Sequence, residues 1–110
     1  PPISDPSELQ VELQNEAEGE NLIACYRQKE PARKLPNLQN IPVLFLNGEG
    51  GYHRIFDHCL ANWLNQAGVS TEYVRLEEVG LPGNGHEMML ELNSKGIAEF
   101  ISSWLGENIE

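Results

Sequence analysis

The segment GLPGNGHEMM, residues 80–89, places one histidine directly behind a glycine-rich stretch. Histidine suits general acid–base catalysis, in which its ring serves a nucleophile on one side and a carboxylate on the other. Gly83 and Gly85, on either side of Asn84, allow backbone conformations and close approaches that other residues resist. The apolar Met88 and Met89 would then tuck the following chain under the loop. The spacing is typical of a catalytic His86 and equally of a glycine turn before an ordinary surface histidine.

Metal binding is a weaker interpretation of the histidines. The segment HEMML begins like the zinc motif H-E-x-x-H, but Leu90 stands where the second histidine is required. His53 and His58 lack the four-residue spacing that would put them on one helical face. His53 and Asp57 do share a face, although such a pair is more often a solvated contact. We therefore expect no metal site.

Nucleotide binding is the second alternative, because GEGGYH, residues 48–53, partly matches the dinucleotide fingerprint G-x-G-x-x-G. His53 replaces the third glycine, Glu77 and Glu78 lie near the end of a following strand, and a helix N-terminus could hold an anion. A tight strand-to-helix turn explains the same glycines more simply. The fingerprint therefore remains a minor alternative.

Four segments of the chain have the pattern of regular structure that would position these residues. Residues 41–47, IPVLFLN, form an apolar run typical of a strand buried on both faces. Residues 52–68 have helical apolar spacing that ends at a glycine, residues 70–76 read as a second strand, and residues 93–105 read as a second amphipathic helix. A strand–helix–strand unit of this length predicts parallel strands. The fold class is therefore α/β, with too few elements to cover its own sheet.

Residues 1–40 differ from the remainder, being acidic at first and then basic, and holding five of the seven prolines. Such a segment is a poor candidate for a packed domain. We expect a short helix capped by Ser4 or Asp5 with Pro6 in its first turn, and a helical turn and loop around Pro36. We therefore divide the chain into a loop-rich linker, 1–40, and an α/β unit, 41–110.

The bulk composition limits the partners and the compartment. Seven basic and 17 acidic residues give a net charge of −10, which argues against binding nucleic acid or an anionic membrane. No apolar run has the length of a membrane span, and no signal peptide is visible in residues 1–6. Two cysteines are too few for a disulfide framework. We expect Cys25 and Cys59 as free thiols in the cytoplasm, with a single bridge between them as the alternative.

Residues 41–105 resemble the C-terminal part of an α/β-hydrolase, the fold of many serine esterases, lipases and lactonases. The resemblance rests on IPVLFLNGE, YHRIFDHCLANWLNQAG, STEYVRL, GNGHEMM and GIAEFISSWL, in that order. It implies a mostly parallel sheet of about eight strands with a nucleophile–acid–histidine triad. His86 would be the general base, Glu49 the candidate acid and Asp57 a lower-ranked one, unless the acid lies outside this chain. Residues 1–40 would then return from a lid region to the sheet.

The resemblance also predicts what the chain lacks, because α/β-hydrolases present their nucleophile in a G-x-Nuc-x-G elbow. Neither cysteine has these neighbours, nor has any serine: Ser4, Ser7, Ser70, Ser94, Ser102 and Ser103. We expect the elbow upstream of residue 1, so that the chain alone is inactive and the complete enzyme hydrolyses a small carboxylic ester, a lactone or a similar bond without a cofactor. The open sheet edge predicts pairing with a complementary N-terminal half or self-association. A non-catalytic partner-binding module is the remaining alternative.

Overall fold

The computed structural model describes residues 4–109, and its centre is a parallel pair of strands. β3 (Val43–Asn47) and β4 (Thr71–Arg75) pair in register from Val43 opposite Thr71 to Asn47 opposite Arg75. α1 (Asp57–Gln66) connects them, and α2 (Ser94–Asn108) follows. The element order is the one that the apolar patterns predict. Its assignment to an α/β-hydrolase sheet remains a prediction.

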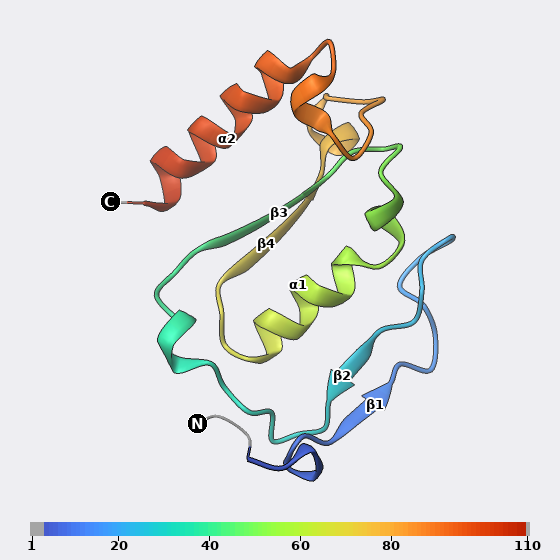
Figure 1. Ribbon diagram of the computed structural model, residues 1–110, viewed down its shortest axis with the longest axis vertical. Helices are drawn as coiled ribbons and strands as arrows, with labels where there is room; N and C mark the ends of the chain where they lie inside the picture. The colour runs from blue at the N-terminus through green and yellow to red at the C-terminus, as the bar shows by residue number, and fades with distance from the viewer. Residues whose placement is uncertain (1–3, 110) are drawn as a thin grey trace.

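The two helices cover opposite faces of this small sheet (Figure 1). On one face the indole Nε1 of Trp104, in α2, donates a hydrogen bond of 2.6 Å to Glu72 of β4. On the other face, towards α1, lie the side chains of Asn47 and Tyr73, and the amide of Asn47 donates to Asp57. Alternate residues of a strand point to opposite faces, so Glu72 and Tyr73 necessarily serve different helices. The core is therefore divided between two layers.

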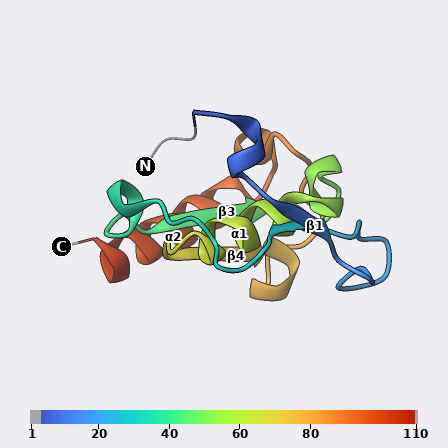
Figure 2. The same cartoon turned by 90° about the horizontal axis from the view of Figure 1, so that it is seen from below.

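β3 is less buried than its apolar sequence predicts. Asn47 is its buried residue, and Val43–Leu46 are half-buried. Among residues 4–109, β3 pairs only with β4 and β4 only with β3, so each strand has an open edge, on opposite sides of the pair in Figure 2. A parallel sheet usually has both faces covered and further strands beside it, so the described part of this sheet lacks neighbours.

The predicted helix over 52–68 divides into two parts. A 3-10 turn, η3 (Tyr52–Ile55), comes first, and Phe56, with φ −138° and ψ −15°, interrupts the helical backbone before α1. The predicted end is correct, because Gly68 has a φ of +85°, which favours glycine. Two further 3-10 turns, η4 (Leu76–Val79) and η5 (Met88–Leu90), bound the loop that contains His86.

The N-terminal segment contains a hairpin that the sequence patterns do not reveal. β1 (Val11–Leu13) and β2 (Tyr26–Gln28) pair antiparallel. Before them lies η1 (Pro6–Glu8), where Asp5 forms the N-cap, as predicted, and after them lies η2 (Pro36–Leu38). Each strand has three residues, too few for an alternating pattern to stand out.

A disulfide and three amide hydrogen bonds, one of them from Asn62 to Glu18, join the hairpin to α1. Cys25 and Cys59 form a disulfide, with their Cα atoms 5.2 Å apart, so the prediction of free thiols is wrong. The side chain of Gln66 accepts a 2.8 Å hydrogen bond from the backbone N–H of Gln28 and donates one of 2.7 Å to its carbonyl. The two cysteines meet because β2 lies against α1, which the sequence alone does not specify. Across residues 4–109, the structure contains no helix with the length and apolar character needed to span a bilayer.

Candidate functional site

Two loops at the carboxyl ends of β3 and β4 interlock to form the candidate site. The backbone N–H of Gly50 donates a 2.8 Å hydrogen bond to the carbonyl of Asn84, and the N–H of Gly83 donates one of 2.9 Å to the Glu49 carboxylate. A Cβ added to Gly48 would lie 2.3 Å from the carbonyl oxygen of Asn84. Only glycine permits this approach, so the predicted strand-to-helix glycine turn also holds the histidine loop.

The loop before His86 is fixed by its own residues as well. Gly83 has a φ of +78°, the left-handed region that glycine tolerates. Asn84 is 1% exposed, and its amide donates a 2.8 Å hydrogen bond to the carbonyl of Leu81. The N–H of Gly85 donates to the carboxylate of Glu91 at 2.9 Å. These bonds hold the backbone on the N-terminal side of His86 in one place.

His86 is exposed and lies among aromatic rings of η3. Its imidazole stacks on that of His53, with centroids 4.7 Å apart and planes 15° apart. The ring of Tyr52 lies 4.8 Å away and is tilted by 51°. An exposed imidazole with one supported face can exchange protons with a group bound on its open side.

The two predicted acids have different surroundings. Asp57 is 8% exposed, and its Oδ2 accepts a 2.8 Å hydrogen bond from the amide of Asn47. Its Oδ1 lies 3.3 Å from Nδ1 of His53. Glu49 is exposed and accepts from Gly83. Within the described range neither carboxylate hydrogen-bonds His86, so the structure brings both acids near the histidine loop without completing a triad.

The hydrogen bonds behind Asp57 continue into the sheet. The phenol of Tyr73 donates a 2.6 Å hydrogen bond to Oδ1 of Asn47, the last residue of β3. Burial raises the pKa of the Tyr73 phenol above its usual value, so this group stays a neutral donor. Asn47 is thereby oriented with its amide nitrogen toward Asp57. The carboxylate is anchored in the fold and is largely buried.

The residue patterns do not place His53 and Tyr52 beside His86. The four-residue spacing of His53 and Asp57 was the available signal, and the interpretation as a solvated contact is wrong because Asp57 is buried. The stack of His53 on His86 depends on how two loops meet, so no pattern within one segment of the sequence predicts it.

The two methionines behind His86 differ in burial. Met88 begins η5 and is half-buried, whereas Met89 is 69% exposed. Leu90 and Leu92 are also exposed, at 76% and 108%. A 3-10 turn directs successive side chains to different sides, so only part of this apolar segment faces the described chain.

The nucleotide alternative gains no support from the local geometry. A dinucleotide fingerprint leads directly from a strand through glycines into an α-helix, but here η3 intervenes and α1 begins at Asp57. The acids near the end of β4 are engaged by arginines, Glu77 by Arg54 and Glu78 by Arg75. The glycines are explained by the contact between the two loops.

One group of metal-ligand types occurs among residues 4–109, formed by Cys25, His58 and Cys59. The two sulfurs are joined as a disulfide, whereas thiolates are the form that binds metals. This group lies between β2 and α1 and shares no residue with the loops at His86.

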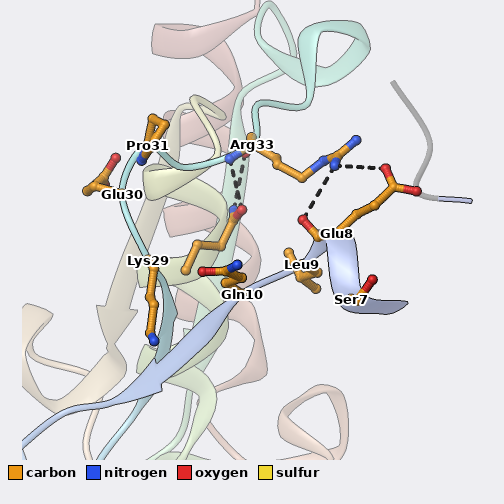
Figure 3. A pocket seen from close by; sticks show the side chains of 9 residues that line it. Ser7, Glu8, Leu9, Gln10, Lys29, Glu30, Pro31 and Arg33 are labelled. Carbon is orange, nitrogen blue, oxygen red and sulfur yellow. Dashed lines mark hydrogen bonds and ion pairs between the residues drawn. The ribbon is translucent and has the colours of Figure 1, made fainter. Parts of the chain in front are cut away.

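A surface hollow of about 310 Å³ lies between η1 and the base of the hairpin (Figure 3). At its rim the guanidinium of Arg33 lies 3.2 Å from the Glu8 carboxylate. The hollow is lined by Ser7, Glu8, Leu9, Gln10, Gln28, Lys29, Glu30, Pro31 and Arg33. None of these residues belongs to the His86 or Glu49 loops.

Comparison with known proteins identifies a lipase as a relative. The chain is 43% identical over 81 residues to a protein named probable secreted lipase phiG from a fungus, Fungal sp. (strain ATCC 74256). The matched part is 74% of this chain and 22% of the lipase, so the chain spans about a fifth of that relative's length. No family model and no solved structure matches the chain.

The cytoplasmic location expected from the sequence is contradicted by this relative, which is named as secreted. The bond between Cys25 and Cys59 agrees with the correction, because disulfides persist in oxidising, extracellular surroundings. The identity over most of the chain supports a relationship to lipase-like hydrolases.

Proposed function

We propose that this chain is the C-terminal part of an ester hydrolase and that His86 is its general base. The similarity to a secreted lipase carries the proposal. The position of His86 supports it, since the loop follows β4 at the carboxyl end of a parallel strand. Residues that do chemistry in open α/β sheets gather at this end.

A nucleophile from outside this chain completes the mechanism. It attacks the carbonyl carbon of a carboxylic ester or lactone while His86 takes its proton, and His86 then returns that proton to the leaving alcohol. In the second half of the cycle His86 activates a water that releases the acid. The chain spans about a fifth of the lipase relative, which leaves room in a longer protein for the nucleophile elbow.

Glu49 is the better candidate for the acid that orients His86. It is exposed on the neighbouring loop, and its carboxylate already accepts the N–H of Gly83. Asp57, the lower-ranked candidate, has its two oxygens directed at Asn47 and His53. In this proposal Glu49 exchanges the N–H of Gly83 for a hydrogen bond from the His86 ring, which completes the triad.

The missing portion docks, in this proposal, on an open sheet edge and on the apolar segment behind His86. Met89, Leu90 and Leu92 are all more than two-thirds exposed in the chain as described. Burying them contributes about 25 cal/mol for each Å² removed from water. This exposed apolar surface favours partner binding. In this proposal the partner is the N-terminal portion that contains the nucleophile.

The test is reconstitution. The chain is co-expressed with an N-terminal portion that contains the nucleophile elbow, and hydrolysis of p-nitrophenyl acetate is measured for wild type and His86→Ala. Glu87→Gln, an exposed change at the next position, is the control. The proposal expects a large loss only in His86→Ala, and equal activity in all three complexes would refute it.

A further inference from the structure

A continuous set of polar contacts runs from the sheet to the stacked histidines. Tyr73 donates to Asn47, Asn47 donates to Oδ2 of Asp57, and Oδ1 of Asp57 lies 3.3 Å from Nδ1 of His53. An Nδ1–H at this position donates to the carboxylate and leaves Nε2 as the acceptor nitrogen of the ring. The orientation of His53 is therefore set from two strands and one helix.

The ring of His53 is held by packing as well as by the carboxylate. Tyr52 and Phe56 lie 4.2 and 4.9 Å from it, centroid to centroid. Its side chain is 31% exposed, whereas that of Asp57 is 11% exposed. Burial thus decreases outward from Asp57 to His53 and then to the exposed His86, as in a site whose inner residues are fixed and whose outer residue meets a ligand.

His86 has less support of its own. The rings of His53 and Tyr52 lie against its imidazole, and the hydrogen bonds of its loop hold the backbone on either side of it and not the imidazole itself. An imidazole that rotates about its side-chain bonds loses the geometry that proton transfer needs. The planes of the two imidazoles are 15° apart, so the fixed ring limits the tilt of the exposed one.

We infer that His53 is a positioning residue for His86, and that Asp57 acts on the base through His53 and not by touching it. The inference rests on the proposed role of His86. It changes the role of Asp57 from a candidate triad acid to the anchor of a supporting ring. Glu49 then remains the candidate acid that orients His86 from the other loop.

The stack is tested by NMR on the chain as it exists. In wild type, the ring current of His53 shifts the imidazole protons of His86 upfield. His53→Gln keeps a donor for Asp57 but removes the ring, so the His86 protons are expected to move downfield by the contribution of that ring, while the contribution of Tyr52 remains. Glu99→Gln, which changes the acid of another i,i+4 pair on α2, is expected to leave them unchanged.

Asp57→Asn tests the anchor with little change in size. An amide offers one acceptor oxygen where the carboxylate offers two, so Asn47 and His53 can no longer both be satisfied. The Nδ1–H tautomer of His53, read from its ring ¹⁵N shifts while the imidazoles are neutral, is expected to lose population, and the ring-current shift on His86 to shrink. Unchanged His86 protons in a folded His53→Gln chain would overturn the inference, as would an unchanged His53 tautomer in Asp57→Asn.

Kinetics in the reconstituted enzyme separate positioning from a general structural role. His53→Gln is expected to lower kcat by roughly 10- to 100-fold with KM unchanged, the scale of a small misplacement. His53→Phe restores a ring and is expected to recover part of kcat. Wild-type kcat in His53→Gln would contradict positioning. The activity of His86→Ala tests the proposed function separately. If His86→Ala loses activity but His53→Gln keeps wild-type kcat, the proposed function stands and only the inference about His53 is refuted.

Discussion

Gly48 is the residue on which the geometry of the site most directly depends. A Cβ there would lie 2.3 Å from the carbonyl oxygen of Asn84 and 2.7 Å from that of Gly85, so a side chain forces the two loops apart. The sequence shows a glycine turn at this position and gives no indication of the partner loop.

Gly48→Ala is expected to lower the free energy of unfolding by about 1–3 kcal/mol, because overpacking displaces backbone that cannot rotate away. Thermal or urea unfolding measures the loss. Gly106→Ala is the matched control, since Gly106 is exposed in α2 with nothing within 4 Å of an added Cβ. That change should add about 0.5–1 kcal/mol, because alanine favours a helix. An unaltered stability in Gly48→Ala would disprove the close contact.

Glu8 gives a pH prediction at the other end of the molecule. The hydroxyl and N–H of Ser4 and the N–H of Asp5 donate to its carboxylate and lower its pKa to about 2. Because the folded pKa lies below the ordinary 4.5, the stabilisation of this turn is complete above about 4.5 and is lost as the pH falls through about 2.

NMR titration of the amides of Ser4 and Asp5 checks the prediction at Glu8. Their shifts should change with a midpoint near 2 in wild type and should lack this transition in Glu8→Gln. A midpoint near the ordinary value would mean that these hydrogen bonds do not form in solution.

At the scale of elements, the helices and strands with many apolar residues could be predicted from the sequence, whereas the short strands of the hairpin could not. β3, α1, β4 and α2 were predictable because each has enough apolar residues at one period to bury a face. The strands of the hairpin have three residues each and mostly exposed side chains, so their pairing depends on long-range bonds to α1. The stack of His53 on His86 has the same origin, because it joins two loops that are distant in sequence.

Removing the disulfide should weaken the attachment of this hairpin to α1 and lower the stability of the chain. Cys25 and Cys59 are 34 residues apart, and opening such a loop costs about 2–4 kcal/mol of stability. The double change Cys25→Ser and Cys59→Ser is expected to lower the urea midpoint, and a thiol reductant should lower that of wild type similarly. A wild-type midpoint that does not respond to reductant would contradict a stabilising bridge.

At the scale of the whole molecule, the described chain is an open structure. It measures 47 × 37 × 19 Å. Unpaired edges of β3 and β4 lie on its two sides. Exposed edges of this kind pair with other strands.

The chain alone is therefore expected to self-associate. Sedimentation at micromolar concentrations should show an average mass that rises with concentration, and addition of the N-terminal complement should replace self-association with a one-to-one complex. A monomer that stays folded at every concentration and ignores the complement would argue against an incomplete sheet.

The central claim is that His86 is the base of an ester hydrolase completed by another part of the protein. The most direct measurement is kcat for p-nitrophenyl acetate in the reconstituted complex, compared between wild type and His86→Ala with Glu87→Gln as control. We predict that His86→Ala lowers kcat by about 100- to 10,000-fold, the contribution of a positioned acid–base group, while Glu87→Gln stays near wild type. Undiminished kcat in His86→Ala would contradict the account.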